Sequence, residues 1–264
     1  MGMENRKRQT IGEMRAYLES VDFLVDEEWE SMVREDGREG VKKLLAQVKK
    51  VRERREEERR HWRELSHYEQ ELWAAGYLYI AGIDEVGRGP LAGPVVSAAV
   101  ILSPEFYLPG LNDSKQLTPV ERERFEEEIR KNAVAIGLGW VYPEEIDQIN
   151  ILNATKKAMV EAVTSLPHPP QYLLIDALSL PIHLPQRSIV GGDGKSISIA
   201  AASVVAKVAR DRYMMRLAEE YPMYGFERNV GYGTREHLEA IARYGICPAH
   251  RRTFAGVKEQ IKGN

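Results

Sequence analysis

The chain has 264 residues, of which 43% are hydrophobic, and a formal net charge of -3. A chain of this length and composition can bury a full core, as one large domain or as one domain with a small appendage. Because the net charge is near zero, the composition excludes a protein that binds nucleic acid through overall basicity, and any such partner must be argued from local clusters.

The sequence carries no sign of a membrane or secreted protein. No apolar run approaches the roughly 20 residues needed to cross a bilayer, and the first residues, "MGMENRKRQTIGEM", are charged where a secretory signal is apolar. The single cysteine, Cys247, cannot form an internal disulfide and indicates a reducing compartment. We therefore expect a cytoplasmic protein without membrane association.

Residues 1–75 are predicted to form a separate helical N-terminal domain, because they are rich in charge, lack proline and show helical periodicity. Residues 19–39 carry nine acidic residues against two arginines, whereas residues 42–65 carry ten basic residues against five acidic ones. Two interpretations of the basic helix stay open. It contacts duplex phosphates and raises affinity in a salt-sensitive way, or it belongs to an amphipathic helix pair whose charges are solvated or mutually compensated.

Residues 76–264 show short apolar runs that alternate with helical stretches, followed by a helical C-terminal region. This order is typical of an α/β domain with a mixed central sheet flanked by helices. The strands are expected at residues 77–84, 95–102, 133–141 and 171–178, and the helices at residues 118–132, 149–166 and 196–222.

Acidic residues follow two of the predicted strands. Asp84 and Asp176 each end an apolar run, and ligand sites of α/β sheets gather at the carboxyl ends of strands. One such aspartate alone is more often a cap of a turn or helix. The pair Asp84 and Glu85 favours a bound divalent cation, because like charges held close otherwise require a proton. Neighbouring side chains of a strand point to opposite faces, so both serve one site only at a turn, which Gly87 and Gly89 supply.

A fourth acid, Asp193, lies in the glycine-rich segment "VGGDGKS" ahead of the last long helix. Alone it is best interpreted as a turn residue or helix cap. With the other three acids it offers oxygen ligands to Mg²⁺ or Mn²⁺. Two such ions about 4 Å apart activate a water and stabilise the leaving oxygen in phosphodiester cleavage.

Two other kinds of site are disfavoured. The glycines of "GRGPLAG" (87–93) fall as GxGxxxG, which misses the dinucleotide-binding fingerprint. His183, His237 and His250 are dispersed along the chain and are expected to be surface or structural residues, and no cluster of cysteine and histidine predicts a zinc site.

Five segments together resemble the ordered motifs of ribonuclease HII, the bacterial type 2 ribonuclease H, over about residues 78–255. They are "AGIDEVGRGPLAGPVVSAAVIL", "LNDSKQL", "LLIDAL", "GGDGKSISIAAASVVAKVARDR" and "YGFERNVGYGTREH". The N-terminal extension resembles that of some Gram-positive relatives. The resemblance implies a ribonuclease H-like fold, dependence on Mg²⁺ or Mn²⁺ through two metal ions, and cleavage of RNA in RNA/DNA hybrids and at single ribonucleotides embedded in duplex DNA.

The resemblance also implies roles for particular residues. The four catalytic and metal-binding acids correspond to Asp84, Glu85, Asp176 and Asp193. Contacts to the ribose 2′-hydroxyl, the group that distinguishes RNA from DNA, are implied for Gly87, Arg88 and Gly89, and stacking on the deoxyribose after the junction is implied for Tyr232. Phosphate contacts are implied for Lys115, for Asn112 as a weaker candidate, and for Lys207 and Arg210, which are three residues apart and so share a helix face.

The implied reaction is hydrolysis on the 5′ side of the ribonucleotide, which leaves 3′-hydroxyl and 5′-phosphate ends. No obligatory protein partner is expected, and a monomer suffices. Two alternatives stay in view. Ribonuclease HIII is similar around the first acidic pair but has glutamate as its fourth acid, so Asp193 argues against it. A non-catalytic hybrid-binding protein is disfavoured while all four acids remain, because carboxylates repel phosphate unless metal ions intervene.

Overall fold

The computed structural model describes residues 9–34 and 36–262. The chain divides into two compact units, residues 1–63 and 64–264, so the predicted domain boundary at residue 75 stays a prediction. Within the described ranges, no helix is both long and apolar enough to cross a membrane.

The first unit is helical. It contains α1 (Ile11–Ser20), α2 (Glu27–Arg34) and most of α3 (Glu39–Leu65). Helix α1 begins with a capping box in which Thr10 and Glu13 satisfy each other's backbone N–H groups. The small core of this first unit consists of Met14, Leu18, Trp29, Val33, Val41, Leu44 and Val48, which come from all three helices.

One mixed sheet lies at the centre of the second unit. Its strands are β1 (Ile80–Val86), β2 (Val95–Ile101), β3 (Ala135–Val141), β4 (Tyr172–Asp176) and β5 (Gln186–Ile189). The order across the sheet is β3-β2-β1-β4-β5. β2 pairs antiparallel with β1 and β3, whereas β4 pairs parallel with β1 and β5. The predicted mixed sheet is confirmed, and β5 was not predicted because its sequence, "QRSI", is short and largely polar.

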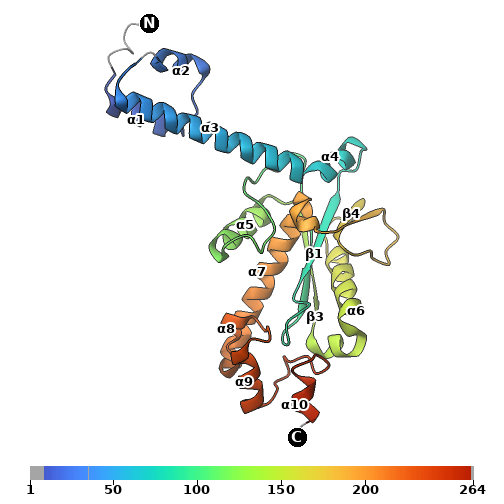
Figure 1. Ribbon diagram of the computed structural model, residues 1–264. Coiled ribbons are helices and arrows are strands. Elements are labelled where there is room, and N and C mark those ends of the chain that lie inside the picture. Colours follow the sequence, from blue (N-terminus) through green and yellow to red (C-terminus); the bar gives the residue numbers. More distant parts are fainter. Residues whose placement is uncertain (1–8, 35, 263–264) are drawn as a thin grey trace. The chain divides into compact units, whose positions relative to one another are not determined.

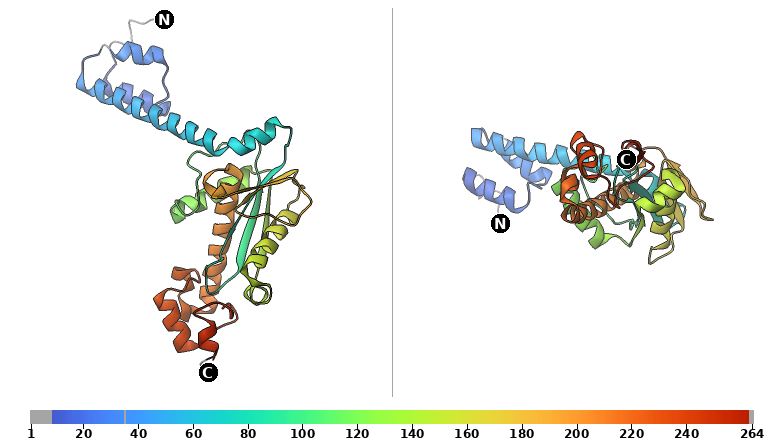
Figure 2. Two further views of the ribbon diagram at one scale, coloured as in Figure 1. Left: turned by 45° about the vertical axis from the view of Figure 1, so that its right-hand side comes forward. Right: turned by 90° about the horizontal axis from the view of Figure 1, so that it is seen from below.

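Helices cover both faces of this sheet. Helix α6 (Pro143–Thr164) lies on one face and α7 (Ile197–Glu220) on the other, as Figures 1 and 2 show. Helix α5 (Pro119–Asn132) packs on α7 and matches the helix predicted at residues 118–132. Thr118 caps its start, and proline lies in its first turn. Helix α4 (His67–Ala74) precedes β1.

A glycine lets α7 approach the sheet closely. A Cβ atom on Gly82 of β1 would lie 2.0 Å from the carbonyl carbon of Ser198 in the first turn of α7. Because residues two apart share a strand face, Asp84 points toward α7 as well. The absence of a side chain at Gly82 therefore brings the start of α7 against the strand that ends in the acidic pair.

The C-terminal region packs against the second half of α7. It comprises the 3-10 turn η3 (Pro222–Tyr224), α8 (Phe226–Asn229), α9 (Arg235–Tyr244) and α10 (Lys258–Lys262). An apolar cluster that includes Met214, Phe226, Ile241 and Val257 holds these elements together.

Candidate active site

Three carboxylates meet at the end of β1 and β4. These strands are parallel neighbours, and Ile83 pairs with Ile175, so the next residue on each is an aspartate. Ligand oxygens of Asp84, Glu85 and Asp176 all lie within 4.8 Å of one another. The expectation that acids at the ends of neighbouring strands share one edge is therefore confirmed.

The expected turn at Gly87 and Gly89 is present, but it is not what brings the acidic pair together. Asp84 and Glu85 were expected to serve one site only at a turn, whereas both belong to the strand β1. The turn begins after the strand, at Gly87, whose φ is 90°. The two side chains leave opposite faces near the strand end, and their oxygens converge there with Asp176.

Burial and mutual repulsion make the ionised forms of these three carboxyl groups unfavourable. Burial raises the pKa of Asp84 well above its usual range, and the charges of Glu85 and Asp176 raise it further. Burial also raises the pKa of Glu85, against the lowering effect of Arg88. The pKa of Asp176 is raised mainly by burial as well. A bound divalent cation would favour the ionised form of all three groups.

An unsatisfied oxygen fits the same interpretation. Oε2 of Glu85 is buried and has no hydrogen-bond partner among the described residues. Buried carboxylate oxygens are normally paired, hydrogen-bonded or bound to a cation. Clustered carboxylates are the ligands that hard ions such as Mg²⁺ and Mn²⁺ prefer. The residues present therefore fit a divalent metal site.

Asp193 lies beside this group rather than within it. It occupies the 3-10 turn η2 (Gly192–Gly194), is buried, and accepts a hydrogen bond from Lys115 Nζ at 3.0 Å. The same turn reaches the carboxylate cluster, because the Gly192 N–H donates to Asp176 Oδ1 at 2.7 Å. Burial lowers the pKa of Lys115, but Asp193, with other acids nearby, raises it to about 12.

A buried pair of serines supports the cluster, and sequence reasoning missed it. Ser203 of α7 hydrogen-bonds to Asp84, which lowers the pKa of that carboxyl. The hydroxyl groups of Ser203 and Ser114 lie 2.9 Å apart. Ser114 belongs to the "NDSKQL" segment, in which Asn112 donates to Gln116 at 3.1 Å. This network ties Asp84 to the loop that carries Lys115.

The glycine-arginine-glycine turn and Tyr232 lie together next to the carboxylates. Arg88 Nη1 lies 3.2 Å from Glu85 Oε1, and the Arg88 side chain is 45% exposed. A Cβ atom on Gly89 would lie 3.6 Å from Cε1 of Tyr232, so the tyrosine ring borders the turn. Tyr232 is itself 45% exposed. Arg88 and Tyr232 are therefore partly exposed groups beside the acidic cluster, at the point where the chain leaves β1.

Comparison with known proteins identifies the family. Residues 81–257 match the model of the family described as ribonuclease HII, and residues 10–73 match that of the ribonuclease HII N-terminal domain. The chain belongs to the ribonuclease HII family. It is therefore a ribonuclease H enzyme, for which the family implies hydrolysis of RNA in RNA/DNA hybrids with the help of divalent metal ions.

Relatives and solved structures agree with this assignment. The ribonuclease HII of Bacillus cytotoxicus is 53% identical over 253 residues, which cover 96% of this chain and 97% of that protein. The ribonuclease H2 structure from Pyrococcus horikoshii is 27% identical, with a TM-score of 0.61, and covers 70% of this chain and 97% of its own. Bst ribonuclease HIII in complex with Mn²⁺ shares the fold at 20% identity and a TM-score of 0.55, over 70% of each chain. The predicted ribonuclease H-like fold is confirmed.

Two predicted phosphate contacts of this ribonuclease HII chain have different surroundings. Lys207 is partly exposed, and its Nζ lies 2.7 Å from Asp211 Oδ1. Arg210 is fully buried, and its guanidinium donates to the carbonyl oxygens of Pro94, Val230 and Ala92 at 3.0–3.1 Å. Lys207 and Arg210 were expected to share a helix face and contact phosphate. The burial of Arg210 argues against its part in that expectation, because the C-terminal region covers α7 at Arg210.

Two of the histidines are structural, in agreement with the expectation that they are surface or structural residues. His237 and His250, although dispersed along the chain, are both buried, and their Nε2 atoms lie 3.1 Å apart. His237 Nδ1 lies 2.8 Å from the carbonyl oxygen of Tyr232, which can only accept, so this nitrogen carries hydrogen. His250 therefore donates from Nε2 to His237, and its Nδ1 accepts from the Cys247 N–H at 3.0 Å. This chain of hydrogen bonds ends at the backbone carbonyl of Tyr232, whose ring borders the glycine-arginine-glycine turn.

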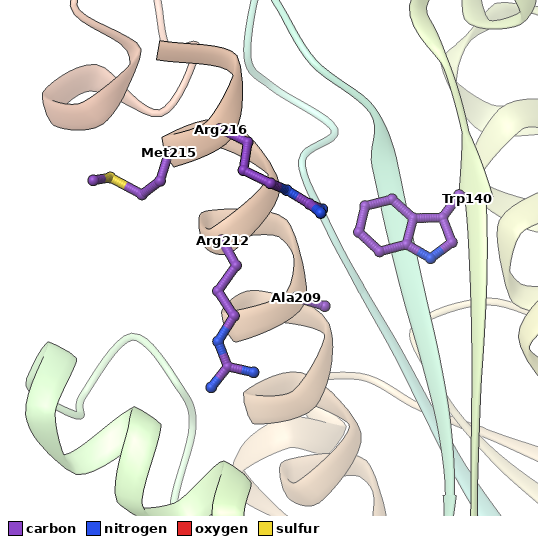
Figure 3. A pocket seen from close by; sticks show the side chains of 5 residues that line it. All are labelled: Trp140, Ala209, Arg212, Met215 and Arg216. Atoms are coloured by element: carbon purple, nitrogen blue, oxygen red, sulfur yellow. The ribbon is translucent and has the colours of Figure 1, made fainter. Parts of the chain in front are cut away.

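A shallow pocket of about 480 Å³ lies between β3 and α7. Figure 3 shows Trp140 facing Arg216, with Arg212 and Met215 on the same helix. Arg212 is already paired with Glu123 and Glu126 of α5. None of the predicted site residues lines this pocket, so we do not assign it to the active site.

Proposed function

We propose that the enzyme cleaves duplex DNA on the 5′ side of a single embedded ribonucleotide, leaving 3′-hydroxyl and 5′-phosphate ends, in addition to hydrolysing RNA in longer hybrids. One observation carries this proposal. Arg88 lies 3.2 Å from Glu85, and Tyr232 borders Gly89 of the same turn. Groups suited to reading a sugar therefore adjoin groups suited to holding metal at a phosphate, as a cut beside that sugar requires.

In this proposal Asp84, Glu85 and Asp176, with Asp193, bind Mg²⁺ or Mn²⁺, in a site for two ions. When bound, the ions supply positive charge to the phosphate oxygens and lower the pKa of water. The protein orients their ligands. Ser203 holds the Asp84 carboxyl and the Gly192 N–H holds Asp176. Asp193 becomes available when Lys115 releases it.

Recognition of the sugar is assigned to the glycine-arginine-glycine turn and Tyr232. The 2′-hydroxyl both donates and accepts hydrogen bonds, so it can accept from the Arg88 guanidinium and from backbone N–H groups of the turn that Gly87, Arg88 and Gly89 form. An exposed tyrosine ring offers a flat apolar surface for the next, 2′-deoxy sugar. Because these residues recognise one ribose and the deoxyribose that follows it, a single ribonucleotide in DNA suffices for recognition.

Phosphate binding is assigned to Lys115 and Lys207, with Asn112 as a weaker contact. Each lysine pairs with a carboxylate, Asp193 or Asp211, and can exchange that partner for phosphate. Arg210 is left out of this group because it is buried and its donors are occupied.

We assign residues 76–264 to catalysis and propose that residues 1–75 add contacts to duplex phosphates through α3. Some bases of this helix are compensated, as in the Arg54–Glu58 pair at 2.9 Å. Others are exposed and form no ion pair with the described residues: Lys43, Lys50 and Arg59. Replacing these three by glutamine should flatten the salt dependence of hybrid binding by up to about 0.9 in log-log slope per lost contact. An unchanged slope would favour the alternative, a helix whose charges are only solvated.

We also propose that the enzyme removes ribonucleotides and primer RNA in the cytoplasm, as a monomer without an obligatory protein partner. The buried free thiol of Cys247 suits a reducing compartment. Size-exclusion chromatography with light scattering tests the monomer.

The cleavage proposal is tested with a DNA duplex that contains one ribonucleotide and with an RNA/DNA hybrid. Each is incubated with Mg²⁺, Mn²⁺ or a chelator, using the wild-type enzyme and Asp84→Asn. We expect metal-dependent cleavage of both substrates by the wild type and neither by the variant. Cleavage of the hybrid alone would refute the single-ribonucleotide activity, and cleavage in chelator would refute the metal site.

A further inference from the structure

A second fully buried arginine, Arg251, contacts the glycine-arginine-glycine turn from the inside. Its guanidinium donates to the carbonyl oxygens of Gly87 at 2.5 Å, Arg88 at 2.9 Å and Gly93 at 2.8 and 3.0 Å. Its own backbone N–H donates to Leu91 at 2.8 Å. One side chain thus holds both ends of the segment that carries Arg88.

Arg210 braces the other side of the same segment. It donates to Ala92 and Pro94, and to Val230, which lies two residues before Tyr232. The Leu91 N–H donates to the Gly231 carbonyl oxygen at 2.8 Å. The two arginines therefore join the turn to the segment that carries the tyrosine.

Neither guanidinium has a carboxylate as its hydrogen-bond partner among the described residues; both donate only to carbonyl oxygens. Burial lowers the pKa of Arg251 to about 9, with a further contribution from Arg210, and that of Arg210 to about 10. A buried cation without a hydrogen-bonded carboxylate is costly, and the planar set of donors offsets this cost only if the carbonyl groups stay in place. The arrangement therefore fixes the backbone of the turn.

The geometry of the peptide bond converts this contact into an orientation of N–H groups. In a trans peptide the C=O and N–H of one planar unit point in opposite directions. Because the carbonyl groups of Gly87 and Arg88 point inward to Arg251, the N–H groups of Arg88 and Gly89 point outward. No backbone acceptor among residues 9–34 and 36–262 receives these two N–H groups.

We propose that Arg251 is a positioning residue for recognition of the ribose 2′-hydroxyl: it turns the carbonyl groups of Gly87 and Arg88 inward, so that the N–H groups of Arg88 and Gly89 face the sugar. This inference rests on the proposed function, since it concerns the same turn. It adds a buried residue outside the contact surface, 163 positions from Arg88 in the sequence, to the determinants of specificity.

Arg251→Lys tests the proposal, because one ammonium group keeps the charge but cannot serve carbonyl groups on both sides. The readout is the ratio of affinities for a duplex with one ribonucleotide and the same duplex in all-DNA form. Binding is measured with Ca²⁺ in place of Mg²⁺, and product analysis verifies that the duplex stays intact. Arg252→Lys, an exposed neighbour, is the matched control.

The ratio should fall about tenfold in Arg251→Lys, since two hydrogen bonds of ordinary strength are misplaced. The affinity of Arg251→Lys for the all-DNA duplex should stay at the wild-type value. The control Arg252→Lys should keep the wild-type ratio and melting temperature. A folded Arg251→Lys protein that keeps the wild-type ratio would overturn the proposal. A wild-type protein that shows no preference for the ribonucleotide would instead refute the proposed function.

Amide exchange on the wild type removes the dependence on a variant that fails to fold. The N–H groups of Arg88 and Gly89 should exchange rapidly in the free protein. They should become protected by the ribonucleotide duplex but not by the all-DNA duplex. Equal protection by both duplexes, or slow exchange in the free protein, would overturn the proposal.

Discussion

Ile83 of β1 and Ile175 of β4 are paired in parallel register, and each is followed by an aspartate. Asp84 and Asp176 therefore leave the sheet at the same level, where Glu85 joins them. Backbone pairing, rather than a loop, holds these like charges together. Because the sheet cannot relax to separate them, their repulsion is relieved by protonation or by a cation.

Removing the charge of Asp84 should stabilise the metal-free protein while abolishing activity. Asp84→Asn relieves a buried charge whose pKa is raised by burial and by two neighbouring acids. We expect an increase of about 1 kcal/mol in unfolding free energy at pH 7.5, or roughly 3 °C in Tm, and a loss of at least about a thousandfold in kcat. Calorimetry and a hybrid cleavage assay measure these effects. Asp22→Asn, at an exposed site, should change neither, and a destabilised Asp84→Asn would contradict this account.

Stabilisation by Mg²⁺ should grow as the pH rises. The pKa values of Asp84, Glu85 and Asp176 are raised in the folded state. Above the unfolded pKa of about 4 the folded protein therefore binds more protons, and its stability falls as the pH rises through the raised values. Mg²⁺ binds the ionised groups, so the Tm difference with and without 10 mM Mg²⁺ should increase from pH 5.5 to 8.5. At pH 8.5 it should correspond to about 1–2 kcal/mol of unfolding free energy. A difference that is constant or largest at acid pH would argue against a carboxylate metal site.

The His237–His250 pair should make the fold sensitive to acid. Burial and the neighbouring His237 lower the pKa of His250 to about 4. Because the unfolded state binds the proton more tightly, stability is complete above the unfolded pKa of about 6.5 and is lost as the pH falls toward 4, by about 3 kcal/mol. The slope of unfolding free energy against pH should be shallower in His250→Asn. NMR should find the hydrogen of His237 on Nδ1, and a hydrogen on Nε2 would disprove the hydrogen-bond directions deduced from the Tyr232 carbonyl.

Arg88 and Tyr232 should control selectivity more than chemistry. Arg88→Ala and Tyr232→Ala should each lower kcat/KM for the single-ribonucleotide duplex by about ten- to a hundredfold. They should affect a long RNA/DNA hybrid less, because it offers many positions for cleavage. Tyr232→Phe keeps the ring that borders Gly89 and should remain near wild type. Equal losses on both substrates would place these residues in general binding or folding.

The sequence allowed prediction of the acids because their position depends on local pattern. An apolar run that ends in an aspartate predicts a carboxylate at a strand end, and the neighbouring run around Asp176 repeats this pattern. Asp193 was predicted only in combination with these acids and through the family resemblance, because its glycine-rich segment alone indicates a turn or a helix cap. Its ion pair with Lys115 depends on how two loops pack, which spacing along the chain does not reveal.

The burial of Arg210 and the contact between His237 and His250 could not be predicted without the tertiary structure. Helical spacing correctly puts Lys207 and Arg210 near one another, but it does not show that the C-terminal region covers Arg210. His237 and His250 are 13 residues apart and meet because the chain returns after α9. Arg251 follows His250 directly, yet its partners lie far earlier in the sequence. Only the folded backbone brings these groups together.

The central claim is that the acidic cluster cuts beside the sugar read by the neighbouring turn. The most direct test maps the cut in an end-labelled DNA duplex with one internal ribonucleotide, in Mg²⁺, at single-nucleotide resolution, followed by extension of the product with a DNA polymerase. We predict one cut at the phosphate 5′ of the ribonucleotide and a 3′ end that the polymerase extends. A cut on the 3′ side, or a 3′ end that cannot be extended, would contradict the account.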